Sequence, residues 1–138
     1  MTADNKIELG TDFEPKFDSN GLITAISQDA KTGQILMVAY MNKEALDLTI
    51  NTGQAVFYSR SRKKLWKKGE ESGHYQKVKQ ILVDCDQDCL ILKVEVDQGQ
   101  CHVGYMSCFY RTLKLGGGKL EFTAEKVYDP KEAYKKNN

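Results

Sequence analysis

The chain has 138 residues, a net charge of +1 and 41% hydrophobic residues. This length fits one domain with its own core, and the balanced charge excludes a polybasic nucleic-acid binder or a disordered acidic chain. No stretch approaches the roughly 18 apolar residues of a membrane span, and residues 1–10 lack the apolar segment of a secretory leader. We therefore expect a cytoplasmic protein that does not bind membranes.

The first structural signals along the chain are two apolar runs, 22–28 and 34–40. The turn-forming residues 29–33 separate them, which predicts a β-hairpin. Residues 42–51 then form a predicted helix, capped by Asn42 and ended by Thr52 and Gly53. Further strands are predicted by apolar runs bounded by turn residues, at 55–61, 78–83, 89–96 and 109–115.

Strands predominate over a single clear helix, and strands and helices do not alternate. This pattern predicts an α+β domain with a largely antiparallel sheet and few helices. One helix covers little of the apolar strands, so we expect a partner subunit of the same chain. The polar segment 129–138 is expected to be a peripheral tail.

Three aspartates alternate along a short segment and could bind a metal. In an extended backbone, Asp84, Asp86 and Asp88 would point to one side and Cys85 to the other. Their mutual repulsion favours a hard divalent cation, and we expect magnesium. A calcium loop fits less well, because Cys89 stands where that loop needs glycine and no flanking helices are predicted. A solvated acidic turn stays open as the alternative.

All four cysteines lie between positions 85 and 108. In a reducing compartment such a cluster is more typical of metal ligands or reactive thiols than of disulfides. Cys85, Cys101 and Cys108 lack the paired spacing of zinc fingers, yet three ligands would leave zinc one open position for catalysis. With Cys89 as a fourth ligand the site would be structural, although its place in an apolar run favours burial.

The chain has two histidines. His102 directly follows a candidate zinc ligand, so it could act as the general base for an attacking water. His74 lies in the polar loop 70–74, where both a catalytic and a structural role are open.

Residues 60–68 carry six positive charges. On one strand face, Arg60 and Arg62 could grip a phosphate in bidentate fashion, beside two hydroxyl donors. Trp66 could stack on a base or simply pack. A small phosphorylated substrate fits this stretch best; the alternatives are a solvated charged surface and a zinc-stabilised nucleic-acid binder. The candidate phosphate and substrate ligands are Ser59, Arg60, Ser61, Arg62, Trp66 and Lys68.

Several segments together resemble the monofunctional phosphoribosyl-AMP cyclohydrolase family. The resemblance runs from about residue 17 to 111 and implies a single cyclohydrolase domain over residues 1–138. It implies an intertwined homodimer that uses zinc and magnesium to open the adenine ring of phosphoribosyl-AMP between N1 and C6, in histidine biosynthesis. The segments that carry it are Phe57–Arg62, Leu65–Glu70, Ser72–His74, Asp84–Asp88 and Cys101–Phe109.

The resemblance also assigns roles to the candidate ligands. It implies that the three cysteines at 85, 101 and 108 bind zinc shared across the dimer, and that the three aspartates bind magnesium. His102 and His74 are then the candidate catalytic groups. This chain departs from the family at Glu71, where threonine is frequent, and at Cys89, which is not one of the usual ligands.

Overall fold

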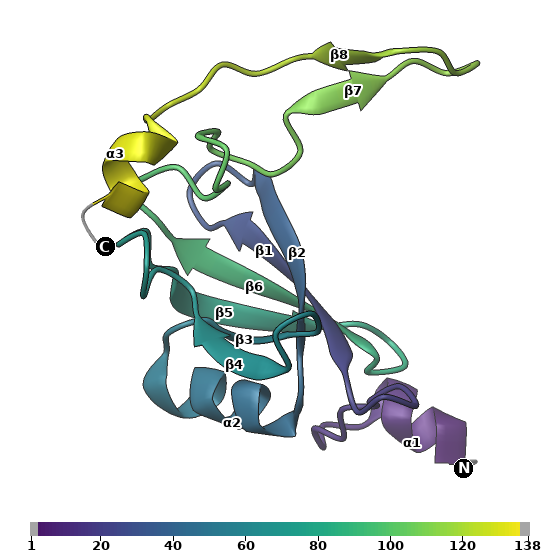
Figure 1. Ribbon diagram of the computed structural model, residues 1–138. Coiled ribbons are helices and arrows are strands. Elements are labelled where there is room, and N and C mark those ends of the chain that lie inside the picture. Colours follow the sequence, from purple (N-terminus) through teal and green to yellow (C-terminus); the bar gives the residue numbers. More distant parts are fainter. Residues whose placement is uncertain (1–2, 136–138) are drawn as a thin grey trace.

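A four-stranded sheet lies at the centre of the computed structural model, which describes residues 3–135. The strand order is β2-β1-β6-β5 (Figure 1). β1 pairs antiparallel with β2, and β6 pairs antiparallel with β5, whereas β1 and β6 run parallel. The predicted α+β class with a largely antiparallel sheet is confirmed. The four strands are β1 (Ile23–Asp29), β2 (Ile35–Met41), β5 (Lys77–Val83) and β6 (Cys89–Glu95).

The β1–β2 hairpin forms at the predicted turn. The Asp29 carboxylate accepts the backbone N–H of Lys31 at 2.9 Å, and the Asp29 N–H donates to the Gln34 carbonyl at 2.8 Å. Gly33 has a φ of 79°, which glycine adopts without the steric cost that a side chain brings. The strands lie one residue later than predicted, and the hairpin is confirmed.

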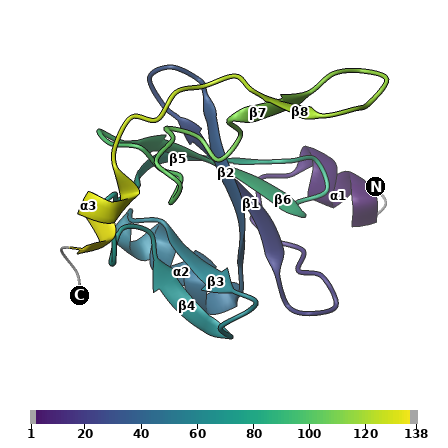
Figure 2. The same cartoon turned by 45° about the horizontal axis from the view of Figure 1, so that its top comes forward.

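Helix α2 (Lys43–Thr52) follows β2 and is capped at both ends. The Asn42 side chain accepts the Ala45 N–H at 2.9 Å, and the Gly53 N–H donates to the Thr49 carbonyl at 2.9 Å. Its buried side, which includes Leu46, packs against β3 (Val56–Ser59). Figure 2 shows α2 beside the β3–β4 hairpin, away from α1 (Ala3–Leu9).

The strand predicted over 55–61 ends at Ser59 and turns back into β4 (Lys64–Lys67), which was not predicted. Trp66 pairs with Phe57 across this hairpin, with ring centroids 5.1 Å apart. The prediction that Arg60 and Arg62 share a strand face is wrong, because both lie in the turn at 60–63. Lys63 takes a φ of 53° there, so the turn forms without glycine and leaves little trace in the sequence.

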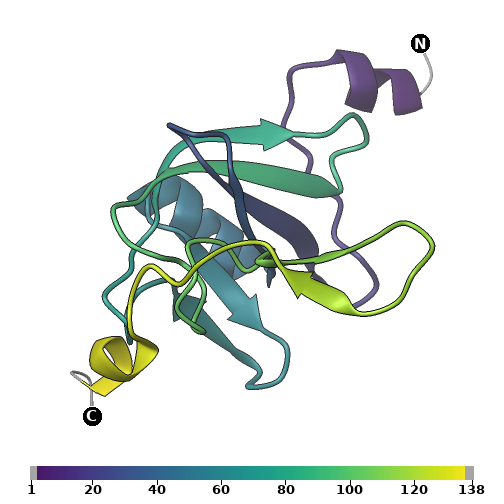
Figure 3. The same cartoon turned by 90° about the horizontal axis from the view of Figure 1, so that it is seen from above.

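The C-terminal part forms a further hairpin from β7 (Arg111–Leu113) and β8 (Leu120–Phe122), followed by α3 (Pro130–Lys135). The tip of this hairpin stands away from the sheet in Figures 1 and 3. The predicted strand at 109–115 is thus shorter, and β8, α1 and α3 were not predicted. The end of the predicted tail, 136–138, lies outside the described residues. Within residues 3–135, no helix is long and apolar enough to cross a membrane.

The core lies between one face of the sheet, α2 and the β3–β4 hairpin. Alternate side chains of β1 and of β6 are fully buried, as the two-residue period of a strand requires. The polar side chains of the candidate site lie at the ends of these strands. The largest core side chains are Phe57, Ile23, Leu36, Met41, Leu46, Leu90 and Leu92.

Candidate metal and substrate site

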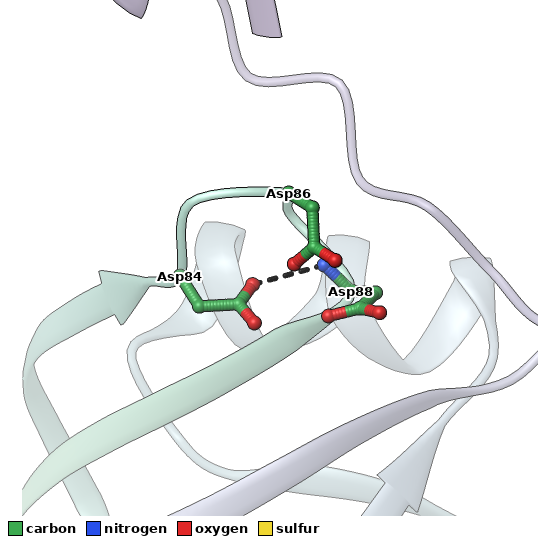
Figure 4. A group of neighbouring side chains, drawn as sticks. All are labelled: Asp84, Asp86 and Asp88. Carbon is green, nitrogen blue, oxygen red and sulfur yellow. Dashed lines mark hydrogen bonds between the residues drawn. The ribbon is translucent and has the colours of Figure 1, made fainter. Parts of the chain in front are cut away.

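The three aspartates converge in the turn between β5 and β6 (Figure 4). One carboxylate oxygen each from Asp84, Asp86 and Asp88 lies within 4.8 Å of those of the other two, and all three residues are exposed. The carboxylates come together as predicted, but for a different reason, because residues 84–88 form a turn rather than an extended strand. Three hard anionic ligands this close repel one another unless a cation lies between them.

Hydrogen bonding gives these carboxyl groups different proton affinities. Asp84 Oδ1 accepts the N–H of Asp88 at 3.0 Å and that of Cys89 at 3.1 Å. Desolvation acts to raise the pKa of Asp84, but hydrogen bonds from Asp88 and Cys89 hold it below its usual value. The pKa of Asp88 is raised, chiefly because its protonated form donates to Asp86 and Asp84. A divalent cation would take the place of that proton.

Gln87 fixes the acidic turn to the N-terminal segment. Its Oε1 accepts the Glu14 N–H at 2.7 Å, and its Nε2 donates to the carbonyls of Ile7 at 3.3 Å and Asp12 at 3.1 Å. The residue is 6% exposed and takes a φ of 60°. Gln87 therefore anchors the turn on its buried side, while the three carboxylates face solvent.

Cys101 and Cys108 lie together in the loop after β6. The Cys101 N–H donates to the Tyr105 carbonyl at 3.0 Å, and the Cys108 N–H donates to the Leu36 carbonyl at 2.7 Å. Desolvation, with the charge and hydrogen bonding of Cys101, raises the pKa of Cys108 to about 12. Cys108 therefore resists ionisation on its own, whereas a coordinated metal ion deprotonates thiols outright.

Cys85 lies far from that pair. It is in the turn before β6, and Cys101 lies in the loop after it, so the seven residues of the strand separate them (Figure 1). A strand of this length rises about 20 Å, whereas two sulfurs on one zinc ion are at most about 4.6 Å apart. Among the described residues, the three cysteines form no common ligand cluster. One protomer cannot bring all three thiols to one ion.

A cavity of about 220 Å³ opens beside the thiol pair. The β3–β4 hairpin, the loop at 69–72 and the loop after β6 enclose it. A Cβ on Gly69 would lie 2.6 Å from the Tyr75 backbone nitrogen, so this loop can turn so closely only with glycine. The lining combines basic, acidic and aromatic groups with one thiol, and includes Arg62, Trp66, Lys68, Glu71, Gln100, His102 and Cys108.

Lys68 is the buried cation of this cavity. It is 7% exposed, and its Nζ donates to the Gln100 carbonyl at 2.8 Å. Burial lowers the pKa of its amine, while the nearby thiols of Cys108 and Cys101 act to raise it. The charge patterning of the sequence gave no sign that one lysine of the basic stretch turns inward.

The other predicted phosphate ligands are divided between two places: Arg62 lines the cavity, whereas Arg60 and Ser61 line a separate hollow beside Tyr40. Ser59 Oγ accepts the Arg62 N–H at 3.2 Å, and the Arg62 guanidinium lies 3.6 Å from a Glu71 carboxylate oxygen. The Arg60 guanidinium stacks 4.1 Å from the centroid of the Tyr40 ring, away from the cavity lining. Of the two arginines, Arg62 is thus the one that faces the cavity. Ser61 lies beside Ser59, with hydroxyls 3.4 Å apart.

The two histidines have contrasting environments. His102 is exposed and borders the cavity together with Cys108. His74 is 5% exposed and meets the Tyr128 ring edge-on at 4.5 Å. Burial lowers the pKa of His74, and a backbone hydrogen bond involving Gly99 opposes this. His74 is therefore packed inside the fold, whereas His102 is exposed at the cavity.

A buried polar chain supports the wall and was not anticipated from the sequence. Ser27 Oγ donates to Gln76 Oε1 at 2.7 Å, and Gln76 Nε2 donates to Gln100 Oε1 at 3.0 Å. The Tyr128 hydroxyl donates to the Cys101 carbonyl. Isolated glutamines in a polar sequence suggest exposed side chains, so no local signal marked this chain of contacts.

Together the fold and the two ligand sets define a single α+β domain with the donor atoms of a metal-dependent enzyme. The family model described as phosphoribosyl-AMP cyclohydrolase matches residues 37–110, which contain the acidic turn, the thiol pair and the whole cavity lining. The chain belongs to this family of hydrolases, which act on a cyclic amidine.

Relatives bearing the same name align over most of the chain. The protein named phosphoribosyl-AMP cyclohydrolase from Rhodopseudomonas palustris (strain TIE-1) is 53% identical, over 97% of this chain and 92% of its own. The one from Methanococcoides burtonii is 56% identical over 86% of this chain and 94% of its own. The one from Methanoregula boonei is 58% identical over 88% and 94%. The similarity thus extends well beyond the family-matched region.

Proposed function

We propose that this protein is a phosphoribosyl-AMP cyclohydrolase that acts in histidine biosynthesis and hydrolyses the N1–C6 bond of the substrate's adenine ring. One observation carries the proposal: the family-matched residues 37–110 contain the thiol pair, the acidic turn and His102. The proposed cyclohydrolase domain spans residues 1–138, because the relative from Rhodopseudomonas palustris aligns with 97% of the chain.

The acidic turn is the proposed magnesium site. Its three carboxylates offer the hard oxygen ligands that magnesium prefers, and solvent can supply the waters that this ion retains. Bound magnesium would orient an anionic substrate or offset its charge.

The thiol pair is the proposed zinc site, completed by Cys85 of the partner subunit. Zinc with three thiolates keeps a fourth position open, as catalytic zinc sites do. Since Cys85 and Cys101 lie at opposite ends of β6, only a second copy can supply the third thiol. The enzyme is therefore a proposed homodimer. Its free cysteines and thiolate ligands suit a reducing compartment, so we place it in the cytoplasm.

The cavity volume supports a composite site. About 220 Å³ is smaller than the usual range of about 300–1,000 Å³ for small-molecule sites. The acidic turn of the partner subunit contains Cys85 of the partner subunit. It would add a further wall and more ligands to this cavity. Phosphate groups would meet Arg62 and the hydroxyls of Ser59 and Ser61, while Trp66 offers a ring for stacking. Arg60 is placed to serve as an outer phosphate ligand.

In the proposed reaction, water adds to C6 of the adenine ring, which ribosylation at N1 has made electrophilic. A zinc ion, when bound, lowers the pKa of a water molecule and acts as a Lewis acid. His102 removes the proton from the attacking water and returns it to N1 as the N1–C6 bond breaks, so C6 becomes a carboxamide carbon. The role of His74 is to hold the wall behind the reacting ring, because its side chain is buried.

The test is an absorbance assay of phosphoribosyl-AMP hydrolysis with metal analysis on the purified protein. We expect turnover that a chelator abolishes and that zinc with magnesium restores, and Cys101→Ala should lose zinc and activity together. Turnover in the metal-free protein would contradict the proposed zinc role. His102→Ala should keep both metals and lower kcat by about 100-fold; an unchanged kcat would contradict the general-base assignment.

A further inference from the structure

Lys68 is an unusual residue because its charge is buried without a carboxylate partner. It is 7% exposed, and the ion pairs among the described residues do not include it. Burying an ammonium group is costly unless an opposite charge compensates it. Its Nζ contacts the Gln100 carbonyl at 2.8 Å and lies 5.9 Å from the centroid of the Trp66 ring, and neither group carries a negative charge.

The groups beside this amine that become negative on binding a metal ion are two thiols: Lys68 lines the cavity with Cys108, and its Nζ donates to the carbonyl of Gln100, the residue before Cys101. Cys108 and Cys101 are the residues whose charges favour the protonated amine. Burial raises the pKa of Cys108, and Cys101 raises it further through its charge and through a hydrogen bond between the two side chains. A fixed cation next to them offsets part of the repulsion between two thiolates.

Two hydrogen bonds hold Lys68 in place, one from its backbone N–H and one from its side-chain amine. The Lys68 N–H donates to the Ala55 carbonyl at 3.0 Å, and its Nζ donates to the Gln100 carbonyl at 2.8 Å. Gln100 is itself fixed, because its N–H donates to the Met106 carbonyl at 3.0 Å and its Oε1 accepts from Gln76. The ammonium group is therefore fixed within the wall of the cavity.

We propose that Lys68 is a positioning residue whose fixed positive charge lies beside the thiolates of Cys101 and Cys108 and strengthens their binding of zinc. The inference rests on the proposed zinc site. Three thiolates and one zinc ion would carry a net charge of −1, and the buried ammonium group would bring the assembly to neutrality.

The test measures the zinc affinity of the metal-free protein by competition with a chromophoric chelator. Lys68→Met removes the charge and keeps the length of the stem, and we expect zinc Kd to rise about 10- to 100-fold, as for other groups that support metal ligands. Lys68→Gln keeps a hydrogen-bond donor for Gln100 but no charge, and should weaken zinc to a similar extent. Lys68→Arg keeps the charge and should recover most of the affinity.

The control is Lys64→Met, which removes an exposed charge from β4, the strand directly before Lys68, and should leave zinc Kd unchanged. Far-ultraviolet circular dichroism of each metal-free variant shows whether it is folded. Wild-type affinity in folded Lys68→Gln would overturn the inference, since a donor alone would then suffice. If Lys68→Met does not fold, Lys68→Gln and Lys68→Arg still decide. A wild-type protein that binds no zinc would instead refute the proposed zinc site, and this inference with it.

Discussion

Because Cys85 lies apart from Cys101 and Cys108, we predict that dimers mixing two inactive variants regain activity. Cys85→Ala and Cys101→Ala should each be inactive alone, because each lacks one ligand in both sites of its dimer. When the two variants are co-expressed, a heterodimer regains one complete site: the Cys101 and Cys108 of one subunit meet Cys85 of the partner subunit. Its second site lacks two ligands.

The expected recovery follows from counting sites. With equal amounts and random pairing, about half of the dimers are heterodimers, and each has one intact site of two, so about a quarter of wild-type activity returns. The zinc content should return in the same proportion. The structural basis is the strand β6, whose length keeps the ligands of one chain about 20 Å apart.

The matched control is co-expression of Cys101→Ala with Cys108→Ala. Both ligands come from the same subunit, so every site in every dimer lacks at least one and no activity should return. Activity is measured with phosphoribosyl-AMP, and zinc by elemental analysis after gel filtration. Equal recovery in both mixtures, or none in the first, would refute the shared site.

Two further predictions concern stability. Gln76→Leu would leave the buried Ser27 hydroxyl and Gln100 Oε1 without their hydrogen-bond partner. We therefore expect the free energy of unfolding to fall by about 3 kcal/mol. A loss below about 1 kcal/mol in urea titrations would contradict this. Since burial lowers the pKa of His74, the unfolded chain gains its proton first as pH falls below about 6.5. Stability should therefore drop through that range, and less so in His74→Gln, as urea midpoints would show.

Local signals determined which parts of the fold could be predicted. The β1–β2 turn carries Asp29 and Gly33, and α2 carries Asn42 and Gly53, so their backbone hydrogen bonds could be anticipated. The turn at 60–63 has no glycine, so β4 was hidden in a run of charge. The parallel pairing of β1 with β6 joins residues more than sixty positions apart, and no turn chemistry reports such a contact.

The candidate site could also be predicted only in part from the sequence. The aspartates and cysteines were recognisable as ligand types, and the resemblance to a family assigned them metals. Which thiols meet depends on the length and direction of β6, and this is visible only in the structure. The inward course of Lys68 and the buried Gln76–Gln100 contact depend on tertiary packing, which overrides the usual preference of such side chains for solvent.

Gln87 links sequence regions that could otherwise vary independently. The family model begins at residue 37, yet the side chain between Asp86 and Asp88 is hydrogen-bonded to residues 7, 12 and 14. All three contacts use backbone atoms of the N-terminal segment, so that segment can change its side chains freely while its path stays fixed. In evolution, insertions and deletions before residue 14 should therefore be constrained more strongly than substitutions there.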